Sequence, residues 1–353
     1  MDYRQYLNDL LDYTAQNGAS DLHLSPSNYP VVRIDGRLSP LMNKKILDRI
    51  TSEGLVFTLL GEKRKEKFLS EKELDFSYDH ANKARFRVNV YFSRGGIAAT
   101  LRLIPSEIRT LEELNLPPII SVFSKLSQGF VLVVGPNGHG KSTTLAAMID
   151  IMNKERSEKI VTIEDPIEYI FTPDKSIIDQ REVDQDTLSF HKALRSTFRQ
   201  NVNVIMVGEM RDYETMSTAV MAAETGHLVL TSLHTNSASQ TIERIIDSFP
   251  PNQQQQIRVQ LASTISGIIS QRLIPSIKGG LIPAVEVMIA TNAVRNLIID
   301  NRVRQIDIVI ETSQNIGMIS LDRSLADLVR RNLIALDKAE FYSLSPNNIK
   351  SFL

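Results

Sequence analysis

Residues 131–148 read VLVVGPNGHGKSTTLAAM, an apolar run that leads into a glycine-rich loop and then a helix-forming stretch. Within it, residues 135–142 fit G-x-x-x-x-G-K-[ST], the phosphate-binding loop of nucleoside triphosphatases. Glycine lets backbone N–H groups converge on a polyphosphate, and the helix that follows offers the positive end of its dipole. The aliphatic residues 131–134 supply the preceding strand that distinguishes this motif from a chance glycine-rich turn. The sequence therefore predicts a nucleotide-binding chain.

The loop residues are expected to have different roles. Lys141 should reach the β- and γ-phosphates, and the Ser142 hydroxyl should complete a Mg²⁺ coordination shell. His139 adds a titratable group close to the phosphates, which predicts a mild pH dependence of binding. The residues expected to contact the nucleotide are Gly135, Pro136, Asn137, Gly138, His139, Gly140, Lys141, Ser142 and Thr143.

Composition limits the class of protein. A chain of 353 residues is long enough for two domains. Its 40 basic and 41 acidic residues give a net charge of −1, so no overall field attracts nucleic acid or membrane. The absence of cysteine excludes disulfides, a thiolate metal site and a cysteine nucleophile. Residues 1–16 have no apolar signal core, and no stretch approaches about 20 apolar residues, so we expect a cytoplasmic protein.

Residues 1–105 are predicted to form a small α+β domain. Helical patterns cover residues 3–16 and 46–69. Turns are expected at Asp35-Gly36 and Gly95-Gly96, between segments that alternate like strands. Helix, strands, helix, strands is the typical order of such a domain. The alternating segments are 21–24, 30–34, 74–79 and 84–104.

The rest of the chain is predicted to be a linker followed by an α/β domain. Residues 106–127 contain Pro117-Pro118 and no sheet pattern, which indicates the linker. Within 128–353, three further apolar runs end in polar residues, which predicts a parallel sheet with a site at the carboxyl ends of its strands. The tail from about residue 255 is expected to be mainly helical. The three runs are 159–165, 202–209 and 226–234.

Hydrolysis of a nucleotide requires an acid near the γ-phosphate. Glu209 ends one apolar run and is our candidate to polarise the attacking water, whereas Glu164 ends another and could act through Mg²⁺-bound water. Ser142, Glu164 and Glu209 are therefore the candidate metal-binding residues, partly through water. His234, after a third run, could sense the γ-phosphate. The alternatives are a solvated carboxylate for Glu209, a turn before Pro166 for Glu164 and a structural histidine for His234.

Taken together, these segments resemble the bacterial type II and type IV secretion ATPases, and most closely the retraction ATPases of type IV pili. The similarity covers almost the whole chain and includes the family's Walker A, Asp-box, Walker B and His-box motifs in the expected order. The segments that carry it are ASDLHLS (19–25), RFRVNVY (85–91), GPNGHGKSTT (135–144), VTIEDPIEY (161–169), VGEMRD (207–212), TGHLVLTSLHTNSA (225–238), SQRLIP (270–275) and AVRNLI (293–298).

The resemblance implies an N-terminal PAS-like domain over residues 1–105 and a RecA-like ATPase domain over 128–353, with a mainly helical C-terminal part. It also implies a homohexamer that binds ATP and Mg²⁺ between domains and subunits. Such a ring couples ATP hydrolysis to type IV pilus retraction, which is pilin disassembly, and so to twitching motility. The implied place is the cytoplasmic face of the inner membrane, against a platform protein at the pilus base. No nucleic acid and no membrane association except through these partners are expected.

The resemblance also assigns residues. Lys141 and Ser142 hold phosphate and Mg²⁺, Glu209 is the catalytic glutamate, and Glu164, His227 and His234 surround the site. The family contributes arginines from its N-terminal domain, and Arg87 and Arg102 are our candidates among the four that match. A solvated basic face is the alternative for these arginines. The four are Arg85, Arg87, Arg94 and Arg102.

The chain departs from the family pattern at two places. Asn137 and His139 stand where the loop usually has threonine and serine, a change that backbone cradling should tolerate. Residues 201–203 (Asn-Val-Asn) replace an acidic-Pro-acidic stretch, so altered turnover with intact nucleotide binding is expected. The segment at 293–298, tied in the family to retraction, is mostly kept.

Several other functions remain as alternatives. A pilus-assembly or type II secretion ATPase is usually longer and often carries a four-cysteine zinc insertion. Accessory retraction ATPases and conjugation-type secretion ATPases are harder to separate from the sequence. A nucleotide-binding regulator with little hydrolysis would not need Glu164, Glu209 and His234. A RecA-type nucleic-acid motor is disfavoured by the near-zero net charge.

Overall fold

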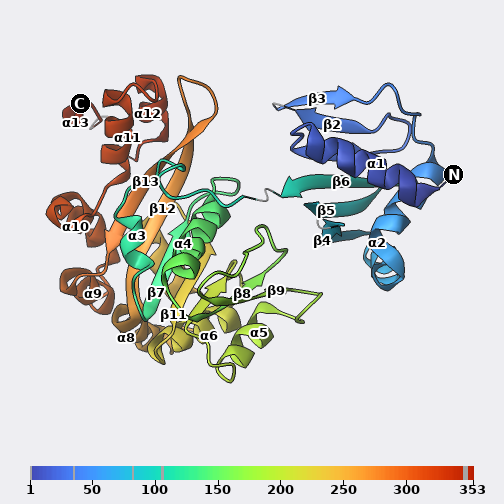
Figure 1. Cartoon of the computed structure of the whole chain (residues 1–353). Helices are drawn as coiled ribbons and strands as arrows, with labels where there is room; N and C mark the ends of the chain where they lie inside the picture. The colour runs from blue at the N-terminus through green and yellow to red at the C-terminus, as the bar shows by residue number, and fades with distance from the viewer. Residues whose placement is uncertain (1, 35, 82, 105–106, 345–348) are drawn as a thin grey trace. The chain divides into compact units, whose positions relative to one another are not determined.

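A computed structural model describes residues 2–34, 36–81, 83–104, 107–344 and 349–353. The chain divides into two compact units (Figure 1). The first comprises Met1–Glu107 and Asp165–Ile170, and the second comprises Ile108–Glu164 and Phe171–Leu353. Pro105, where we expected the first domain to end, lies outside the described residues.

The first unit contains a six-stranded sheet in the order β3-β2-β1-β6-β5-β4, in which every pair is antiparallel. This confirms the predicted α+β organisation, although β3 was not predicted. Asp35, in the expected turn between β2 and β3, lies outside the described residues. The elements are α1 (Tyr3–Gln16), β1 (Asp21–Leu24), β2 (Val31–Ile34), β3 (Arg37–Pro40), α2 (Arg49–Glu71), β4 (Glu73–His80), β5 (Ala84–Ser93) and β6 (Gly96–Ile104).

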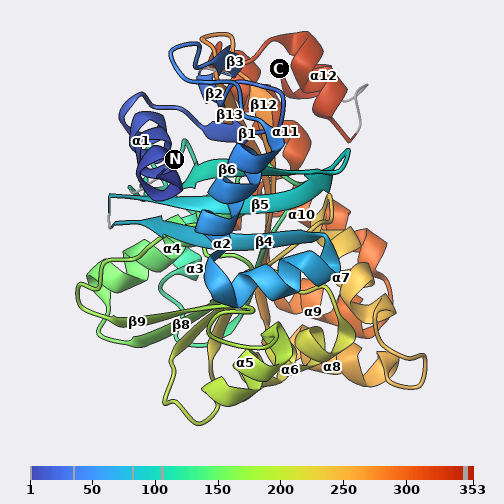
Figure 2. The same cartoon turned by 90° about the vertical axis from the view of Figure 1, so that its right-hand side faces the viewer.

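Both helices of the first unit begin at an aspartate that caps them. The Asp2 side chain accepts hydrogen bonds from backbone N–H groups in the first turn of α1. The Asp48 side chain accepts one from the backbone N–H of Thr51 in α2, at 2.7 Å. Both helices lie against the sheet (Figure 2), and their buried apolar side chains share one core with its strands. Phe68 of α2 and Phe86 of β5 are fully buried in this core. The apolar residues of the two helices and of the sheet therefore form one buried layer.

The second unit contains a seven-stranded sheet in the order β13-β12-β7-β11-β10-β8-β9. Its strands are parallel except β13, which pairs antiparallel with β12. All six residues of β7 are buried, which explains the continuous apolar run before the phosphate loop. The strands are β7 (Gly129–Val134), β8 (Lys159–Glu164), β9 (Ile177–Glu182), β10 (Val204–Val207), β11 (Leu228–Leu233), β12 (Ile265–Pro275) and β13 (Leu281–Ile289).

Helices connect these strands and pack with them around one large apolar core. A second, smaller core joins the ends of β12 and β13 to the last helices of the chain. The helices are α3 (Ile120–Phe123), α4 (Lys141–Glu155), α5 (Phe190–Thr197), α6 (Tyr213–Glu224), α7 (Ala238–Asp247), α8 (Gln254–Thr264), α9 (Asn292–Ile299), α10 (Ile306–Thr312), α11 (Leu321–Arg330), α12 (Leu336–Tyr342) and α13 (Ile349–Phe352).

The prediction of a mainly helical tail from residue 255 was wrong for β12 and β13. These strands form a long antiparallel hairpin whose turn includes Gly279-Gly280. Residues 276–280 connect the two strands. Both strands are nearly continuously buried, so their sequences lack the alternation that identifies a half-exposed strand.

The expected linker at 106–127 also differs from the structure. Residues 108–127 pack with the second unit, and residue 106 lies outside the described residues. The side chains of Leu111, Leu116 and Phe123 are buried there. A proline pair marks irregular backbone, but it does not show whether apolar neighbours are exposed or buried.

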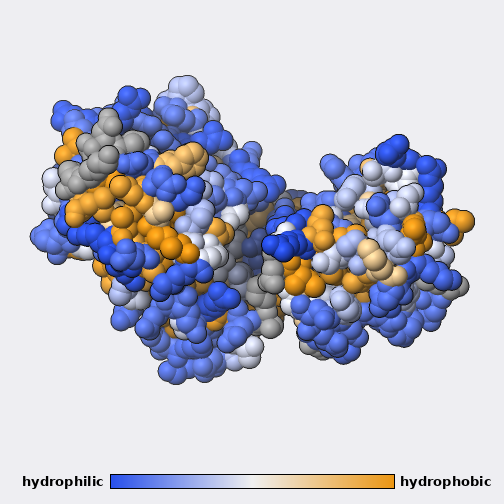
Figure 3. All heavy atoms as spheres, turned by 90° about the horizontal axis from the view of Figure 1, so that it is seen from above, coloured by the Kyte–Doolittle hydropathy of each residue, from blue (hydrophilic) through white to orange (hydrophobic). Residues whose placement is uncertain are grey.

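The surfaces of both units carry exposed apolar side chains among the charged ones (Figure 3). Met42 and Ile50 of the first unit are 76% and 73% exposed, and Phe341 of the second is 78% exposed. Among the described residues, no helix is both long enough and apolar enough to cross a membrane.

Gly267 tests the packing of residues 108–127. A Cβ at this position of β12 would lie 2.2 Å from the Phe123 ring and 3.0 Å from the Met288 carbonyl oxygen. We expect Gly267→Ala to lower the free energy of unfolding of the second unit by about 1–3 kcal/mol through overpacking. In a Phe123→Ala background the added cost should be smaller. Urea unfolding measures both, and equal costs in the two backgrounds would contradict this packing.

Candidate functional site: a phosphate loop at the carboxyl ends of parallel strands

The order of the strands brings three predicted site segments to one edge of the sheet. β11 lies between β7 and β10 and is parallel to both. The phosphate loop follows β7, His234 follows β11 and Glu209 follows β10 by two residues. Because the carboxyl ends of parallel strands meet at the same edge, His234 lies between the other two segments.

The phosphate loop is shaped by glycines that no other residue could replace without strain. Gly135 has φ +146°, and a Cβ there would lie 2.2 Å from the carbonyl oxygen of Gln271 in β12. Gly140 has φ +80° and directly precedes α4. The loop therefore opens onto the N-terminal end of a 15-residue helix, where amide groups and the helix dipole favour an anion. Ser142, in the first turn of α4, is exposed.

Lys141 is held by its own loop and by His234. Its side-chain ammonium donates to the carbonyl oxygens of Gly135 and Pro136, each at 2.9 Å. It also lies 3.3 Å from Nδ1 of His234. Lys141 is 7% exposed, so the positive charge is fixed inside the curve of the loop. This is the place at which the sequence predicted a phosphate contact.

His234 connects Lys141 to Glu209. Because an ammonium group only donates hydrogen bonds, Nδ1 of His234 must accept, and the imidazole proton then belongs to Nε2. Nε2 lies 3.4 Å from Oε2 of Glu209. His234 therefore links the Lys141 ammonium to the Glu209 carboxylate, and these two neighbours set its tautomer.

Glu209 is fixed on both carboxylate oxygens. Oε2 faces His234, and Oε1 forms an ion pair with Arg211, a residue to which we had assigned no role. The Glu209 side chain is 16% exposed. Behind it, the Gly208 N–H donates to the Ile163 carbonyl at 2.8 Å, and the Ser232 hydroxyl donates to the Gly208 carbonyl at 2.6 Å. The backbone that carries Glu209 is thus tied to both neighbouring strands.

Glu164 is a buried carboxylate at the end of β8, the other neighbour of β10. Its Oε1 accepts from the Thr162 hydroxyl at 2.7 Å and from the Gln180 amide at 3.3 Å. Thr162 lies two residues earlier on the same face of the strand. Glu164 therefore belongs to the same edge of the sheet as Glu209, one strand further from the phosphate loop.

His139 and Gln271 fasten the loop to β12. Nδ1 of His139 accepts from the backbone N–H of Leu273 at 2.9 Å. The Gln271 side chain donates to the His139 carbonyl at 2.8 Å and accepts from the Thr144 hydroxyl at 2.7 Å. Burial, with help from the charges of Lys141 and Arg272, lowers the pKa of His139. The segment SQRLIP carried part of the resemblance, but we had given Gln271 no role.

The structure does not bring His227 to this edge of the sheet. His227 precedes β11, whereas His234 follows it, so about 20 Å of strand separate their backbones. Its Nδ1 lies 3.0 Å from the Ala222 carbonyl, and its ring meets Phe198 edge-on at 5.6 Å. Within one chain His227 is therefore not among the residues around Lys141.

Arg87 and Arg102 belong to the first unit, where they lie directly opposite each other on β5 and β6. Arg87 lies 3.4 Å from Glu168, and Nε of Arg102 lies 3.0 Å from the buried Asp21. Burial would raise the pKa of Asp21, but hydrogen bonds from Ser20 and Arg102, with the Arg102 charge, lower it overall. Asp21 thus anchors an arginine whose side chain is 72% exposed. A catalytic role for either arginine stays a prediction.

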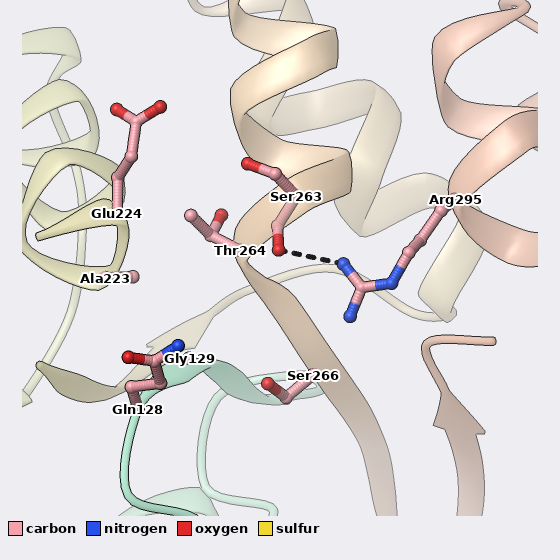
Figure 4. Close-up of a pocket in the computed structure, with 8 residues that line it drawn as sticks. All are labelled: Gln128, Gly129, Ala223, Glu224, Ser263, Thr264, Ser266 and Arg295. Atoms are coloured by element: carbon pink, nitrogen blue, oxygen red, sulfur yellow. Dashed lines mark hydrogen bonds between the residues drawn. The ribbon is translucent and has the colours of Figure 1, made fainter. Parts of the chain in front are cut away.

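A separate cavity of about 290 Å³ lies at the other end of the sheet, beside the first residues of β7 and β12 (Figure 4). Arg295, from the segment AVRNLI, reaches into it and donates to the Ser263 carbonyl at 2.9 Å. It also donates to the Ala262 carbonyl at the end of α8. Arg295 therefore fixes the C-terminal end of a helix, away from the phosphate loop.

The contact between His139 and β12 predicts a pH-dependent loss of stability. His139→Ala removes the acceptor for the Leu273 N–H, and we expect it to lower the free energy of unfolding by about 1 kcal/mol near neutral pH. Because the folded pKa is lowered, the neutral ring stabilises the fold above the unfolded pKa of about 6.5. That contribution is lost as pH falls through the folded pKa. Urea titrations of both proteins from pH 8 to 5 should therefore converge at low pH, and a constant gap would contradict the assignment.

Comparison with known proteins agrees with this geometry. Residues 3–279 match the family model for type II/IV secretion system proteins. The chain is 43% identical to the type IV pilus retraction ATPase PilT of Pseudomonas aeruginosa, over 97% of this chain and 99% of that protein. It is also 43% identical to a twitching motility protein of Neisseria gonorrhoeae, over 88% of this chain and 83% of that one.

Solved structures agree as well. A crystal structure of the pilus retraction motor PilT with bound ADP superposes with a TM-score of 0.91 at 43% identity and covers 98% of both chains. The ATPase DotB of Legionella pneumophila gives a TM-score of 0.84 at 26% identity, over 96% of this chain and 95% of that one. Its sequence and its fold both place this chain in the family of type II/IV secretion system proteins.

Proposed function

We propose that this chain is an ATPase that drives the retraction of type IV pili. The observation that carries the proposal is the row formed by Lys141, His234 and Glu209 at the carboxyl ends of β7, β11 and β10. A cation for the phosphates and a carboxylate for water are the two groups that phosphoryl transfer to water requires. The full-length similarity to PilT, named as a retraction ATPase, supplies the cellular process.

The oxygen atoms near the loop fit a magnesium ion. Ser142, Glu164 and Glu209 would hold it, partly through water, and the ion when bound would neutralise charge on the β- and γ-phosphates. Mg²⁺ at a nucleotide site usually needs only one or two carboxylates, because the phosphates and water complete its shell. The described part of the chain has no group of three or more His, Cys, Asp or Glu side chains that could hold a metal ion.

Each of the other site residues would have its own role in ATP hydrolysis. Lys141 and the amides of the loop would neutralise and orient the phosphates. Glu209, held by Arg211 and His234, would orient the attacking water and accept its proton. His234 would donate to Glu209 through Nε2 and so keep the carboxylate in place. Glu164, with Thr162 and Gln180 as donors to its carboxylate, would face the metal through bound water.

The partners are part of the same proposal. We place the chain in a homohexamer that docks on an inner-membrane platform protein at the pilus base, on the cytoplasmic face of the membrane. The exposed apolar side chains of both units, such as Met42 and Phe341, are surface of the kind that subunit contacts cover. The near-zero net charge and the absence of a basic overall field support protein partners rather than nucleic acid.

Glu209→Gln tests the assignment of the catalytic carboxylate. The amide keeps the size of the side chain but cannot accept a proton, so we expect ATP turnover to fall by about 100-fold or more while ATP still binds. Phosphate release measures turnover, and a fluorescent ATP analogue measures affinity. Glu214→Gln, an exposed acid on α6, is the matched control and should keep full turnover. Turnover of the Glu209 variant within about threefold of the control would contradict the role of Glu209.

The cellular process is tested in a piliated bacterial strain that lacks its own retraction ATPase. We expect the wild-type chain to restore twitching and to shorten surface pili, because hydrolysis would drive pilin disassembly. The Glu209→Gln chain, expressed at the same level, should do neither. Twitching-zone diameters and counts of surface pili are the measurements. Restored pilus assembly in a strain without an assembly ATPase, with no effect on retraction, would instead assign the chain to assembly.

A further inference from the structure

A buried carboxylate lies just behind the segment that carries His234. Glu286, on β13, is 5% exposed and lies directly opposite Ser270 of β12 in the register of the two strands. Oε1 of Glu286 accepts the backbone N–H of Ala238, the first residue of α7, at 2.7 Å. The hydroxyl of Ser270 donates to the carbonyl of Asn236 at 2.9 Å. Two paired strands thus hold residues 236 and 238 through neighbouring side chains on one face of the sheet.

The held segment is short and internally tied. Ser237 caps α7 by accepting the Gln240 N–H at 3.3 Å, and the Thr241 hydroxyl donates back to the Ser237 carbonyl at 2.6 Å. The hydroxyls of Thr235 and Thr241 lie 2.7 Å apart. Between the end of β11 and the start of α7 the backbone therefore has little freedom, and His234 is its first residue.

We propose that Glu286 is a positioning residue for hydrolysis: it holds the first turn of α7 so that His234 stays between Lys141 and Glu209. The proposal rests on the function proposed above. Glu286 touches neither the phosphate loop nor Glu209, and it acts only through the backbone of residues 234–238. Ser270 holds the same segment at a second point, the carbonyl of Asn236.

The charge on Glu286 sets how firmly it holds the segment. Burial raises the pKa of Glu286 to about 7, against the lowering effect of the Ala238 N–H. The charged groups on the surrounding elements are Asp307 on α10 and Asp322 on α11, which raise the pKa, and Arg272 on β12, which lowers it. On α7 itself, Glu243 lies close enough to raise the pKa of Asp307. An ionised carboxylate accepts a stronger hydrogen bond than a protonated one, so the hold is firmer above pH 7.

Stability and turnover should therefore change in opposite directions with pH. Because the folded pKa of Glu286 is raised, its contribution to stability is present below the unfolded value of about 4.3 and is lost as pH rises toward about 7. Turnover, in contrast, should rise over the upper part of that range because the hold becomes firmer. If Glu286 had only a structural role, ATP turnover would fall together with stability as the pH rises.

Glu286→Gln is the test, because it fixes the residue in a neutral form that still offers an acceptor. At pH 8 we expect kcat for ATP to fall about fivefold, the difference between a charged and a neutral acceptor, with KM unchanged because the phosphate loop is untouched. The rise of kcat around pH 7 should disappear. The pH-dependent loss of stability between about pH 4.5 and 7 should disappear as well, as measured by thermal unfolding.

Two further variants complete the test. Ser270→Ala removes the other point of the hold, and it should lower kcat while the rise around pH 7 remains. Asp322→Asn is the matched control: it is a buried carboxylate that accepts the Ser343 hydroxyl at 2.7 Å and the Leu344 N–H at 3.0 Å. This control should keep the value of kcat at pH 8 and its rise with pH. The midpoint of that rise should move to lower pH, because the negative charge of Asp322 no longer raises the pKa of Glu286.

The outcomes separate the inference from the function on which it rests. If the wild-type chain shows no ATP turnover, the proposed function fails and the role of Glu286 fails with it. If the wild type turns over ATP but folded Glu286→Gln keeps its kcat and pH profile, only the positioning role is overturned. If Glu286→Gln does not fold, Ser270→Ala decides, and an unchanged kcat in that variant overturns the role.

Discussion

The position of β11 between β7 and β10 is the constraint on which the site depends. It places the residue after β11 between a lysine that follows one neighbour and a glutamate that follows the other. With a cation on one side and an anion on the other, the imidazole of His234 has one tautomer that satisfies both. A different strand order would leave the same motifs in the sequence with no contact among them.

β12 contacts both the phosphate loop and the segment behind His234. Successive side chains on a strand point to opposite faces, and this alternation gives two neighbours different partners. Gln271 is bonded to the phosphate loop at His139 and to the first turn of α4 at Thr144, whereas Ser270 is bonded to the segment behind His234. Gly135 is required at the same place because the backbone of β12 passes where a side chain would be. One strand therefore positions both halves of the row.

The sequence predicted most of the first unit and the central strands of the second. Periodicity was sufficient for α1, α2 and the strands that follow them, and apolar runs with polar ends were sufficient for β7, β8, β10 and β11. It failed for β12 and β13, where burial on both faces removes the alternating pattern. The linker prediction failed because local composition does not reveal where Phe123 is buried.

The candidate site was predicted in parts. Lys141 was proposed from the phosphate-loop motif, and Glu164, Glu209 and His234 from their positions at strand ends. The contacts among them depend on strand order, which one sequence does not specify. His227 shows that closeness in sequence does not place two residues in one site: it lies seven residues before His234, and the length of β11 separates the two. Arg211, Gln271 and Glu286 gave no signal of their own, because a lone polar residue acquires its role only from what the fold places beside it.

The opposite orientation of Ser270 and Gln271 has a mechanical consequence. If β12 slid by one residue along its neighbours, each of these side chains would be turned to the wrong face, and both loops would be released together. A one-residue slip of β12 would therefore cost both sets of contacts at once. Any movement of β12 that keeps these contacts would carry the phosphate loop and the His234 segment with it.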